Sequence, residues 1–573
     1  AFGLPQEYKI IHPEEILIHK DKNHKTNNKM KFKFLFAAAL LAGASFSSFA
    51  QTHVEGEEYY KADQFANAKE LLLRNMNNTG TNKAVSDFYL GLISLHEGNQ
   101  ADAQKYFNEG LQNNPDYAYN YVGLGILDLK KGDKKAADAQ FKLAESKSKK
   151  DPELQINIAR AYYNTDPVAY AKDIEKRINN ARKYNMEDEN IYLFEGDVKK
   201  DAKDFGGAAS QYEMATTYNP DATPAYVKYA NLFTQVNPEY AIKMLNKLLE
   251  LNPNSALGQR ELANAYYNAG NYKEAATQYG KYVENPNHFK QDEDRYAFLL
   301  FYGGDYQKGY DYSSALLKAN PSNFTAQRYQ FMNAAQMKDM QAQLLPLAEA
   351  LVATHNADPA NNKFAPIDYI LIASELNSAK RPQEAQALLE EAIKDNPTNR
   401  EFYKQLAMTF VEENKLSKAV DAYEGYLANS EKPGYNDFIQ QATFAFYAGV
   451  ENKDNPAEAD KYYAICQSYA DKAAEILPEN YKPKKFAGDI ARQKATEAQA
   501  PFAAVPAYTE ALTLLEASEN PSRYSSDAKE MYNYMGNSYL EQKNVAKAKE
   551  YFNKYLNFDP NNEAYRKFVE GLK

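Results

Sequence analysis

The side chains that most often carry out chemistry in proteins are sparse in this sequence and do not form groups. Cys466 is its single cysteine, so an intrachain disulfide and a cysteine-based metal cage are excluded. Of the seven histidines, His53, His96, His288 and His355 lie beyond residue 50, and long stretches of chain separate them. Because a structural zinc site needs several such ligands close together, we predict no metal site and no cofactor.

Paired carboxylates could in principle serve as a general acid and a general base. The pairs Glu57/Glu58 and Glu412/Glu413 fall on predicted helix surfaces, where a solvated charge is the more frequent role. The sequence has no HExxH motif, no nucleophile elbow and no glycine-rich phosphate loop between a strand and a helix. Cys466 follows the spacing of an apolar helical stripe, which favours a core residue over a nucleophile. We therefore predict that the protein is not an enzyme.

Length, composition and charge restrict the class of protein. The 573 residues exceed what one hydrophobic core needs, and 44% of them are hydrophobic. Aromatic usage is uneven, with 47 tyrosines and no tryptophan. The formal net charge is −10, and because residues 1–50 carry +3, the other 523 residues carry −13. An acidic body argues against binding of nucleic acid, which depends on lysine and arginine contacts to phosphate.

Residues 255–286 show the structural element that recurs through most of the chain. Their sequence, SALGQRELANAYYNAGNYKEAATQYGKYVENP, predicts two short amphipathic helices with apolar residues at three-to-four spacing. Gly270 and Asn271 supply the turn between the helices, since glycine adopts positive φ at little cost and asparagine can cap the next helix. Ala263 and Ala275 place one small residue on each helix, where two helix backbones can approach closely.

A pair of small residues twelve positions apart recurs along the chain. The pairs are Gly91/Ala103, Gly125/Ala137, Gly196/Ala208, Ala263/Ala275, Ala297/Gly309, Ala373/Ala385, Ala407/Ala419 and Gly536/Ala548. Four residues after the second member a bulky residue usually follows, namely Phe107, Phe141, Tyr212, Tyr279, Leu389, Tyr423 or Phe552, with Ser313 as the exception. A Gly-Asn or Gly-Asp turn signal lies midway at Gly98, Gly132, Gly270 and Gly304.

This pattern resembles the tetratricopeptide repeat (TPR), a 34-residue helix–turn–helix unit with small residues at its eighth and twentieth positions. Where units abut, the spacing agrees, because Gly91 to Gly125, Ala263 to Ala297 and Ala373 to Ala407 each span 34 positions. The resemblance implies an all-α fold, a right-handed superhelical α-solenoid of helix-turn-helix repeats. In such a solenoid one helix pair cannot bury its apolar face alone, and stacked neighbours build a continuous core.

The units suggest how the chain is organised. We assign residues 51–354 to a repeat array, 355–366 to a polar connector and candidate hinge, 367–430 to further repeats, 431–526 to divergent helical repeats, and 527–573 to a final repeat with a capping helix. Pro346 is expected to interrupt the repeat pattern. The register of the repeats within 323–353 and 431–505 stays open.

Residues 30–50 resemble a Sec-type secretory signal. Two lysines precede an apolar stretch from Phe34 to Ala44, and Ser48 and Ala50 provide the small-x-small pattern of a cleavage site. The alternative is a buried or anchoring N-terminal helix. We expect cleavage after Ala50 and export to the periplasm or cell envelope of a Gram-negative bacterium.

Residues 1–29 precede Met30, which is the first methionine of the chain. A secretory signal normally stands at the N-terminus of the translated protein. We therefore interpret residues 1–29 as an upstream extension that is either not translated or disordered, and we leave it out of the fold prediction. The mature chain would then begin at Gln51 and contain no transmembrane segment.

In the repeat family, ligand contacts come from the first helix of each unit, and the resemblance implies that role for the matching positions here. These candidate groove residues are Arg260, Asn264 and Tyr267 in one unit and Phe298, Phe301 and Tyr302 in the next. Arg260 with Asn264 is similar to the clamp that holds a peptide carboxylate in some of these domains. That clamp needs several basic residues from adjacent repeats, whereas Arg295 alone is nearby.

The matching positions of two earlier units are apolar. They are Phe88, Leu92, Leu95, Val122, Ile126 and Leu129. Two alternatives stay open for them, namely that they bind a partner or that they pack against one another within a tightly coiled solenoid.

The resemblance implies a non-catalytic scaffold that binds a peptide or protein element in the concave groove of the solenoid. Together with the signal, it suggests a protein of the bacterial cell envelope, whose partner the sequence does not identify. One alternative is a carbohydrate- or peptidoglycan-binding envelope protein, because a tyrosine-rich groove could stack sugars. Another is an accessory subunit of a secretion or nutrient-uptake complex, and a third is an enzyme with an unusual site.

Overall fold

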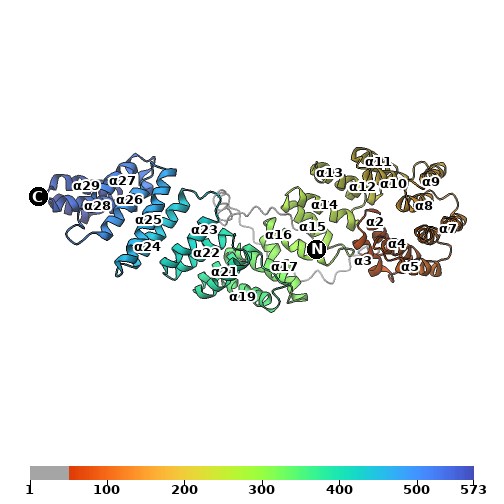
Figure 1. The fold of residues 1–573 in the computed structure, drawn as a ribbon, viewed down its shortest axis with the longest axis horizontal. Coiled ribbons are helices and arrows are strands. Elements are labelled where there is room, and N and C mark those ends of the chain that lie inside the picture. Colours follow the sequence, from red (N-terminus) through yellow and green to blue (C-terminus); the bar gives the residue numbers. More distant parts are fainter. Residues whose placement is uncertain (1–50) are drawn as a thin grey trace, which may run out of the picture. The chain divides into compact units, whose positions relative to one another are not determined.

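The computed structural model describes residues 51–573, and the predictions about residues 1–50 lie outside the described residues. Residues 51–573 form one compact unit. They fold into α-helices joined by turns, with two short 3₁₀ helices and, within this part of the chain, no β-strand (Figure 1). The predicted all-α solenoid of helical repeats is thereby confirmed.

In chain order the helices form hairpins, in which an even-numbered helix comes first and an odd-numbered helix second. The first hairpins are α2 (His53–Lys61) and α3 (Phe65–Asn75), α4 (Lys83–His96) and α5 (Gln100–Asn113), α6 (Tyr119–Lys130) and α7 (Lys134–Lys147), α8 (Pro152–Thr165) and α9 (Ala171–Tyr184), and α10 (Glu189–Asp201) and α11 (Phe205–Tyr218). The next are α12 (Thr223–Phe233) and α13 (Pro238–Leu251), α14 (Ala256–Asn268) and α15 (Tyr272–Val283), α16 (Gln291–Tyr302) and α17 (Tyr306–Ala319), and α18 (Phe324–Ala335) and α19 (Gln341–Ala357).

The remaining hairpins continue the same order. They are α20 (Pro366–Ser378) and α21 (Pro382–Asp395), α22 (Arg400–Glu412) and α23 (Leu416–Ala428), α24 (Tyr435–Glu451) and α25 (Pro456–Ile476), α26 (Lys482–Lys494) and α27 (Val505–Ala517), and α28 (Ser525–Glu541) and α29 (Val545–Phe558). A final short helix, α30 (Glu563–Gly571), follows the last hairpin, as the sequence predicted.

The turn inside a hairpin is set by a residue in the left-handed backbone conformation. Gly98, Gly132, Gly270 and Gly304 have φ between +73° and +82°, which glycine adopts without a steric penalty. The following Asn or Asp caps the second helix, as Asn271 does by accepting a hydrogen bond from the backbone N–H of Glu274. Where glycine is missing, the same conformation is taken by Asp63, Lys203, Lys380, Asn414 and Lys543.

Neighbouring hairpins interlock through an aromatic ring that rests on glycine. Phe107 of α5 is fully buried. A Cβ atom added at Gly91 of α4 would lie 2.3 Å from this ring, and one added at Gly123 of α6 would also lie 2.3 Å from it. Neither position has room for a side chain. Phe107 is therefore held between the first helix of its own hairpin and the first helix of the next.

The part of this contact that lies within one hairpin recurs in other units. It joins Gly125 to Phe141, Gly196 to Tyr212 and Gly536 to Phe552, with an added Cβ at 2.2–2.4 Å from the ring. The sequence pattern attributed the paired small residues to a close approach of two helix backbones. The structure adds a second reason, because the small residue at the eighth position must accommodate the ring that follows sixteen residues later.

The divergent segment, residues 431–526, uses the same contact with altered spacing. Gly449 of α24 faces Tyr463 of α25, fourteen residues later, and Gly488 of α26 faces Tyr508 of α27, twenty residues later. The helices α24 and α25 contain 17 and 21 residues, so their turn and their contact positions shift relative to the 34-residue pattern. This segment therefore contains hairpins of the same kind whose register the pattern could not assign.

The polar connector predicted at residues 355–366 begins later in the structure. Helix α19 continues through Pro346, because this residue lies near the start of the helix and its missing N–H removes a single intrahelical hydrogen bond. The helix ends at Ala357, so His355 lies in its last turn and is buried. The ring of His355 stacks on Phe364, with the ring centroids 4.0 Å apart. The segment between α19 and α20 is thus held against the helices.

We predict that Gly123→Ala destabilises the protein, because its new methyl group would overlap the buried ring of Phe107. Overpacking of this kind costs about 1–3 kcal/mol, which would lower the midpoints of thermal and urea unfolding followed by circular dichroism. Gly206→Ala is the matched control, since Gly206 lies in α11 with no atom within 4 Å of an added Cβ. Equal midpoints for the two variants would contradict the proposed role of the ring contact.

Candidate partner-binding site

The six candidate groove residues lie on the first helices of two adjacent hairpins. On α14, Arg260, Asn264 and Tyr267 are separated by four and three residues, so they share one face of the helix. On α16, Phe298 lies three residues before Phe301, and Tyr302 completes the group at the end of the helix. Asn264 is half-buried, one turn before Tyr267. The two helices therefore present these side chains in neighbouring repeats.

Four of the six residues belong to a continuous group of aromatic rings, which we call the aromatic surface. Its members are Tyr267, Tyr272, Phe298, Phe301, Tyr302 and Tyr329, from α14, α15, α16 and α18. The ring centroids are 6.1 Å apart between Tyr267 and Phe298, 4.5 Å between Phe298 and Tyr302, and 6.2 Å between Phe301 and Tyr329. Tyr329 is buried, Tyr272 is exposed, and the other four are half-buried. The group thus extends from the core to solvent.

Two members of the aromatic surface were not among the predicted residues. Tyr272 was missed because it stands on a second helix, whereas the family pattern points to first helices. Tyr329 was missed because it lies in the segment whose repeat register was open. Arg295, which the sequence analysis had noted as the nearest basic residue, lies over the ring of Tyr267 with its guanidinium carbon 4.6 Å from the ring centroid. This cation–π contact adds a positive charge to one end of the surface.

Arg260 is bound to other residues of the chain. Its Nε donates a hydrogen bond to Oδ2 of Asp292 at 2.7 Å, and its Nη2 donates to Oδ1 of the same residue at 3.4 Å. Asp292 is 5% exposed, so this is a buried bidentate ion pair. The Nη1 atom donates a hydrogen bond of 3.2 Å to Oε1 of Gln64. Gln64 lies in the turn of the N-terminal hairpin, which consists of α2 and α3. Because Asp292 neutralises the guanidinium, the arrangement does not favour capture of a peptide carboxylate by Arg260.

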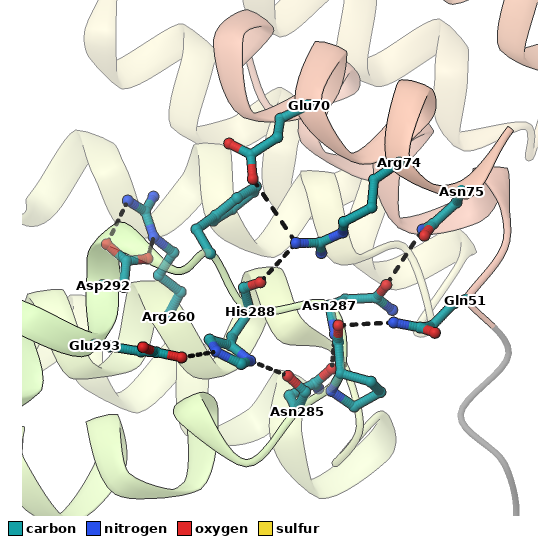
Figure 2. Close-up of polar contacts among 12 residues, drawn as sticks. Gln51, Glu70, Arg74, Asn75, Arg260, Asn285, Asn287, His288, Asp292 and Glu293 are labelled. Atoms are coloured by element: carbon teal, nitrogen blue, oxygen red, sulfur yellow. Dashed lines mark hydrogen bonds and ion pairs between the residues drawn. The ribbon is translucent and has the colours of Figure 1, made fainter. Parts of the chain in front are cut away.

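The N-terminal hairpin, α2 with α3, reaches the segment between α15 and α16 (Figure 2). The hydrogen bonds run from Gln51 Nε2 to the carbonyl of Pro286 (2.9 Å), from Arg74 Nη1 to the carbonyl of His288 (3.0 Å) and from Asn75 Nδ2 to Oδ1 of Asn287 (3.3 Å). The buried ring of Tyr59 meets the ring of Phe289 edge-on at 5.4 Å. These contacts join residues more than 200 positions apart, so the first hairpin shares one core with α12–α16.

A group of charges, of which Lys228 and Asp197 are buried and Asp63 is exposed, also joins the N-terminal hairpin to α8, α10 and α12. Lys228 of α12 is 5% exposed, and its Nζ lies 2.9 Å from a carboxylate oxygen of Asp63 and 2.6 Å from one of Asp197. Arg160 of α8 binds the other oxygen of Asp197 at 2.8 Å. Burial alone would raise the pKa of Asp197, but the charges of Arg160 and Lys228 lower it to about 2. Since removal of one partner from such a network leaves a buried charge unpaired, each member stabilises this arrangement.

The apolar candidate positions of the earlier units pack within the protein. Phe88, Val122 and Leu129 are buried, and Leu92, Leu95 and Ile126 are half-buried against the same core clusters. The structure therefore favours the self-packing alternative for these residues.

The expectation that both carboxylate pairs are solvated was wrong for three of the four residues. The side chain of Glu413 is 4% exposed and pairs with Lys415 at 2.8 Å. Glu57 is half-buried, and its carboxylate binds Lys61 at 2.8 Å and accepts a hydrogen bond from Tyr89 at 3.0 Å. Glu58 is half-buried too and forms no ion pair with any residue in 51–573. The error at Glu57 and Glu58 arises because helices distant in sequence cover α2.

Two carboxylates of α2 have strongly shifted pKa values. Burial raises the pKa of Glu58 to about 8, and repulsion from the charge of Glu55 adds to this shift. Burial likewise raises the pKa of Glu55 to about 7, against the opposing hydrogen bond that its carboxylate accepts from the backbone N–H of Ala256 at 2.9 Å. Both groups are therefore partly protonated near neutral pH.

The cysteine and the histidines, which the sequence analysis considered for chemistry, do not form a reactive or metal-binding group in residues 51–573. Cys466 is fully buried in α25, where burial raises the pKa of its thiol well above the usual range, so the core interpretation is confirmed. Within the part of the chain that the structure describes, no three His, Cys, Asp or Glu side chains are placed to hold a metal ion. Among the helices of residues 51–573, none is long and apolar enough to cross a membrane.

Stacked two-helix hairpins, interlocked by rings that rest on small residues, define the class of helical-repeat solenoids. Family models described as tetratricopeptide repeat match residues 231–288, 376–441 and 530–562. The chain is therefore a tetratricopeptide-repeat protein, in agreement with the resemblance of its sequence.

Several solved structures are similar to parts of this chain. The C-terminal part of a TPR repeat-containing protein from Cytophaga hutchinsonii is 16% identical with a TM-score of 0.39, and the match covers 49% of this chain and 99% of that one. A tetratricopeptide repeat protein from Parabacteroides merdae is 13% identical with a TM-score of 0.31, with 46% and 97% covered. YrrB, a TPR protein with an unusual peptide-binding site, is 17% identical with a TM-score of 0.27, with 39% and 99% covered. TM-scores this low carry no functional argument. No curated protein matches the sequence.

We predict that Glu58→Gln stabilises the protein at alkaline pH. The raised pKa of Glu58 means that the folded protein holds a proton which the unfolded chain has lost, so the wild type loses stability as the pH rises from about 4.5 to about 8. Glutamine removes this loss, and the difference between variant and wild type should grow to at least about 1 kcal/mol at pH 9. Urea unfolding at pH 5 and pH 9 measures it.

Glu57→Gln is the matched control for this prediction. The charge of Lys61 lowers the pKa of Glu57 despite the opposing effect of burial, so its ionised form stabilises the fold at neutral and alkaline pH. The control should therefore destabilise the protein at pH 9, opposite in sign to Glu58→Gln. A pH-independent effect of Glu58→Gln would contradict the assignment of the proton to this carboxyl.

Proposed function

We propose that this protein is a non-catalytic protein–protein interaction scaffold of the bacterial cell envelope, which binds a peptide or protein element at the aromatic surface. The observation that carries the proposal is the half-buried state of Tyr267, Phe298, Phe301 and Tyr302 on two adjacent first helices. Solvent-accessible aromatic groups that gather in one place are typical of interaction sites.

The chemistry of the aromatic surface suits a protein ligand. Tyrosine and arginine are the residues whose truncation most often costs more than 2 kcal/mol at interfaces, and Arg295 lies directly on Tyr267. The rings of Phe298, Phe301 and Tyr302 already pack on a cluster of Ala297, Tyr329 and Met332, which limits the conformational entropy lost on binding. Asp292 and Gln64 already bind Arg260, so we place the contact with the partner on the rings. An extended or helical segment with apolar side chains would fit this chemistry.

Location in the envelope is the second part of the proposal. It is supported by residues 30–50, whose charged start, apolar stretch and small-x-small ending are typical of a secretory signal. An accessory role in a secretion or nutrient-uptake complex would be a more specific form of the same function.

We predict that Tyr267→Ala combined with Tyr302→Ala weakens partner binding by about 2 kcal/mol or more, roughly thirtyfold. The partner can first be captured by a photo-crosslinking phenylalanine analogue placed at position 267 in intact cells, with mass spectrometry of the adduct. Tyr447→Ala is the matched control, because this tyrosine of α24 is exposed and lies outside the aromatic surface.

The outcomes separate the possible functions. A protein adduct at position 267 and none at position 447, with affinity lost in the double variant, supports the proposal. A glycan adduct, or retention on a peptidoglycan pull-down that the double variant loses, would assign the surface to carbohydrate. Undiminished protein binding combined with a lower melting temperature would show that these tyrosines are core residues, and the proposed site would be wrong.

We predict that the protein purified from the envelope fraction begins at Gln51. Cleavage by a signal peptidase after Ala50 would produce this N-terminus, since the small residues of positions 48 and 50 fit its specificity. N-terminal sequencing or peptide mass spectrometry measures it directly. An intact Met30 in the mature protein, or an N-terminus upstream of Met30, would contradict export through this signal.

A further inference from the structure

The hairpin of α16 and α17 lacks the bulky residue that the other regular hairpins place against a small one. At the position of that residue it has Ser313, the exception in the sequence pattern. The equivalent residues of α15 and α21 are Tyr279 and Leu389, and both are fully buried. Within α17 only Gly309 and Ser313 are buried. Helix α17 therefore buries no large apolar side chain completely.

A polar contact joins α17 to the next hairpin. A Cβ atom added at Gly309 would lie 2.6 Å from the side-chain amide of Asn333 in α18. Asn333 and Ser313 are both 0% exposed. The Nδ2 atom of Asn333 donates to the carbonyl of Tyr329 at 2.6 Å, whereas its Oδ1 and the Oγ of Ser313 have no hydrogen-bond partner among residues 51–573. Buried polar atoms of this kind stabilise a helix contact less than an apolar ring does.

Helix α17 also lies where two large hydrophobic cores meet. One core extends from α2 to α16, and the other extends from α18 to α25. Between them lies a small cluster with three buried residues, Ala297, Tyr329 and Met332. The ion pair of Arg260 with Asp292 ties α16 to the first core, and among the ion pairs within residues 51–573 none joins α2–α16 to α18–α25.

The helices on each side of α17 are held together independently. We call α2–α16 the N-terminal block and α18–α25 the C-terminal block. In the N-terminal block the first hairpin returns to α12–α16, so the ends of the block share one core. In the C-terminal block Leu389 and Tyr423 are buried at the position of the interlocking residue, and Tyr463 rests on Gly449. The weak contact at α17 therefore separates two better packed blocks.

We propose that α17 is a hinge at which the N-terminal and C-terminal blocks change their relative angle. Because each repeat of a solenoid contacts mainly its neighbours, the array bends most readily where the contact between neighbours buries the least apolar surface. Hinge motion is concentrated in a few residues between rigid elements. The aromatic surface has Phe298, Phe301 and Tyr302 on one side of the hinge and Tyr329 on the other. A change of the hinge angle therefore alters the distances between its rings.

Distances between pairs of spin labels test the proposal in the full chain, without a partner. The labels are attached to cysteines introduced at exposed positions of second helices, in a Cys466→Ala background. The pair Lys243→Cys and Glu390→Cys spans the hinge, whereas Lys243→Cys with Asn108→Cys lies within the N-terminal block and Glu390→Cys with Ser468→Cys lies within the C-terminal block. Double electron–electron resonance measures the three distance distributions. We expect the distribution across the hinge to be at least about twice as wide as either of the others; equal widths would overturn the proposal.

A variant at Ser313 tests the cause of the hinge motion. Ser313→Leu supplies the apolar side chain that Leu389 provides in α21, so it should narrow the distribution across the hinge toward the widths within the blocks. Asp311→Leu is the matched control, because Asp311 is exposed on the same helix, and it should leave all three widths unchanged.

The melting temperature separates the outcomes for this variant. An unchanged width across the hinge in a Ser313→Leu protein that melts at the same or a higher temperature would contradict the role of Ser313 and overturn the proposal. A lower melting temperature would show that leucine does not fit at this position, and the three widths of the protein with Ser313 then decide.

Discussion

The structure depends on a contact between a buried ring and a residue that has no side chain. Phe107 rests on Gly91 within its own hairpin and on Gly123 of the next, so one ring sets both the spacing inside a hairpin and the spacing between hairpins. A solenoid has no single central core, and each hairpin packs mainly on its neighbours, although the N-terminal hairpin of this protein also packs on α12–α16. The geometry of the whole array is therefore transmitted through local contacts of this kind, which explains why small residues recur so regularly in the sequence.

The regular hairpins could be predicted because everything that determines them lies within 34 residues. The turn at Gly270, its cap at Asn271 and the ring contact are all local. The divergent hairpins could not be assigned a register, since α25 has 21 residues and brings Tyr463 to Gly449 after fourteen positions instead of sixteen. What changes there is the length of the helices, whereas the contact itself is preserved.

At the candidate site, the repeat pattern of the sequence predicts some of the residues but not the contacts they make. The rings of Phe298 and Tyr302 could be found because they occupy repeated positions of a first helix. The pairing of Arg260 with Gln64 could not, since these residues are 196 positions apart and meet only because the N-terminal hairpin returns to α14. Together with the ion pair to Asp292, this contact makes Arg260 part of the fold, so the neighbouring aromatic rings are the candidate surface for a partner.

Because the N-terminal hairpin packs against distant helices, its charged residues have different surroundings. Where the fold brings cations to the hairpin, an ion pair joins it to a distant helix, as between the buried Lys228 and the exposed Asp63. Where no ion pair forms, as at Glu58, burial raises the pKa of the carboxyl to about 8, so a proton compensates its charge near neutral pH. A hairpin that packs among other repeats thus has two kinds of charged group, namely groups that form ion pairs with distant helices and a carboxyl that is held protonated.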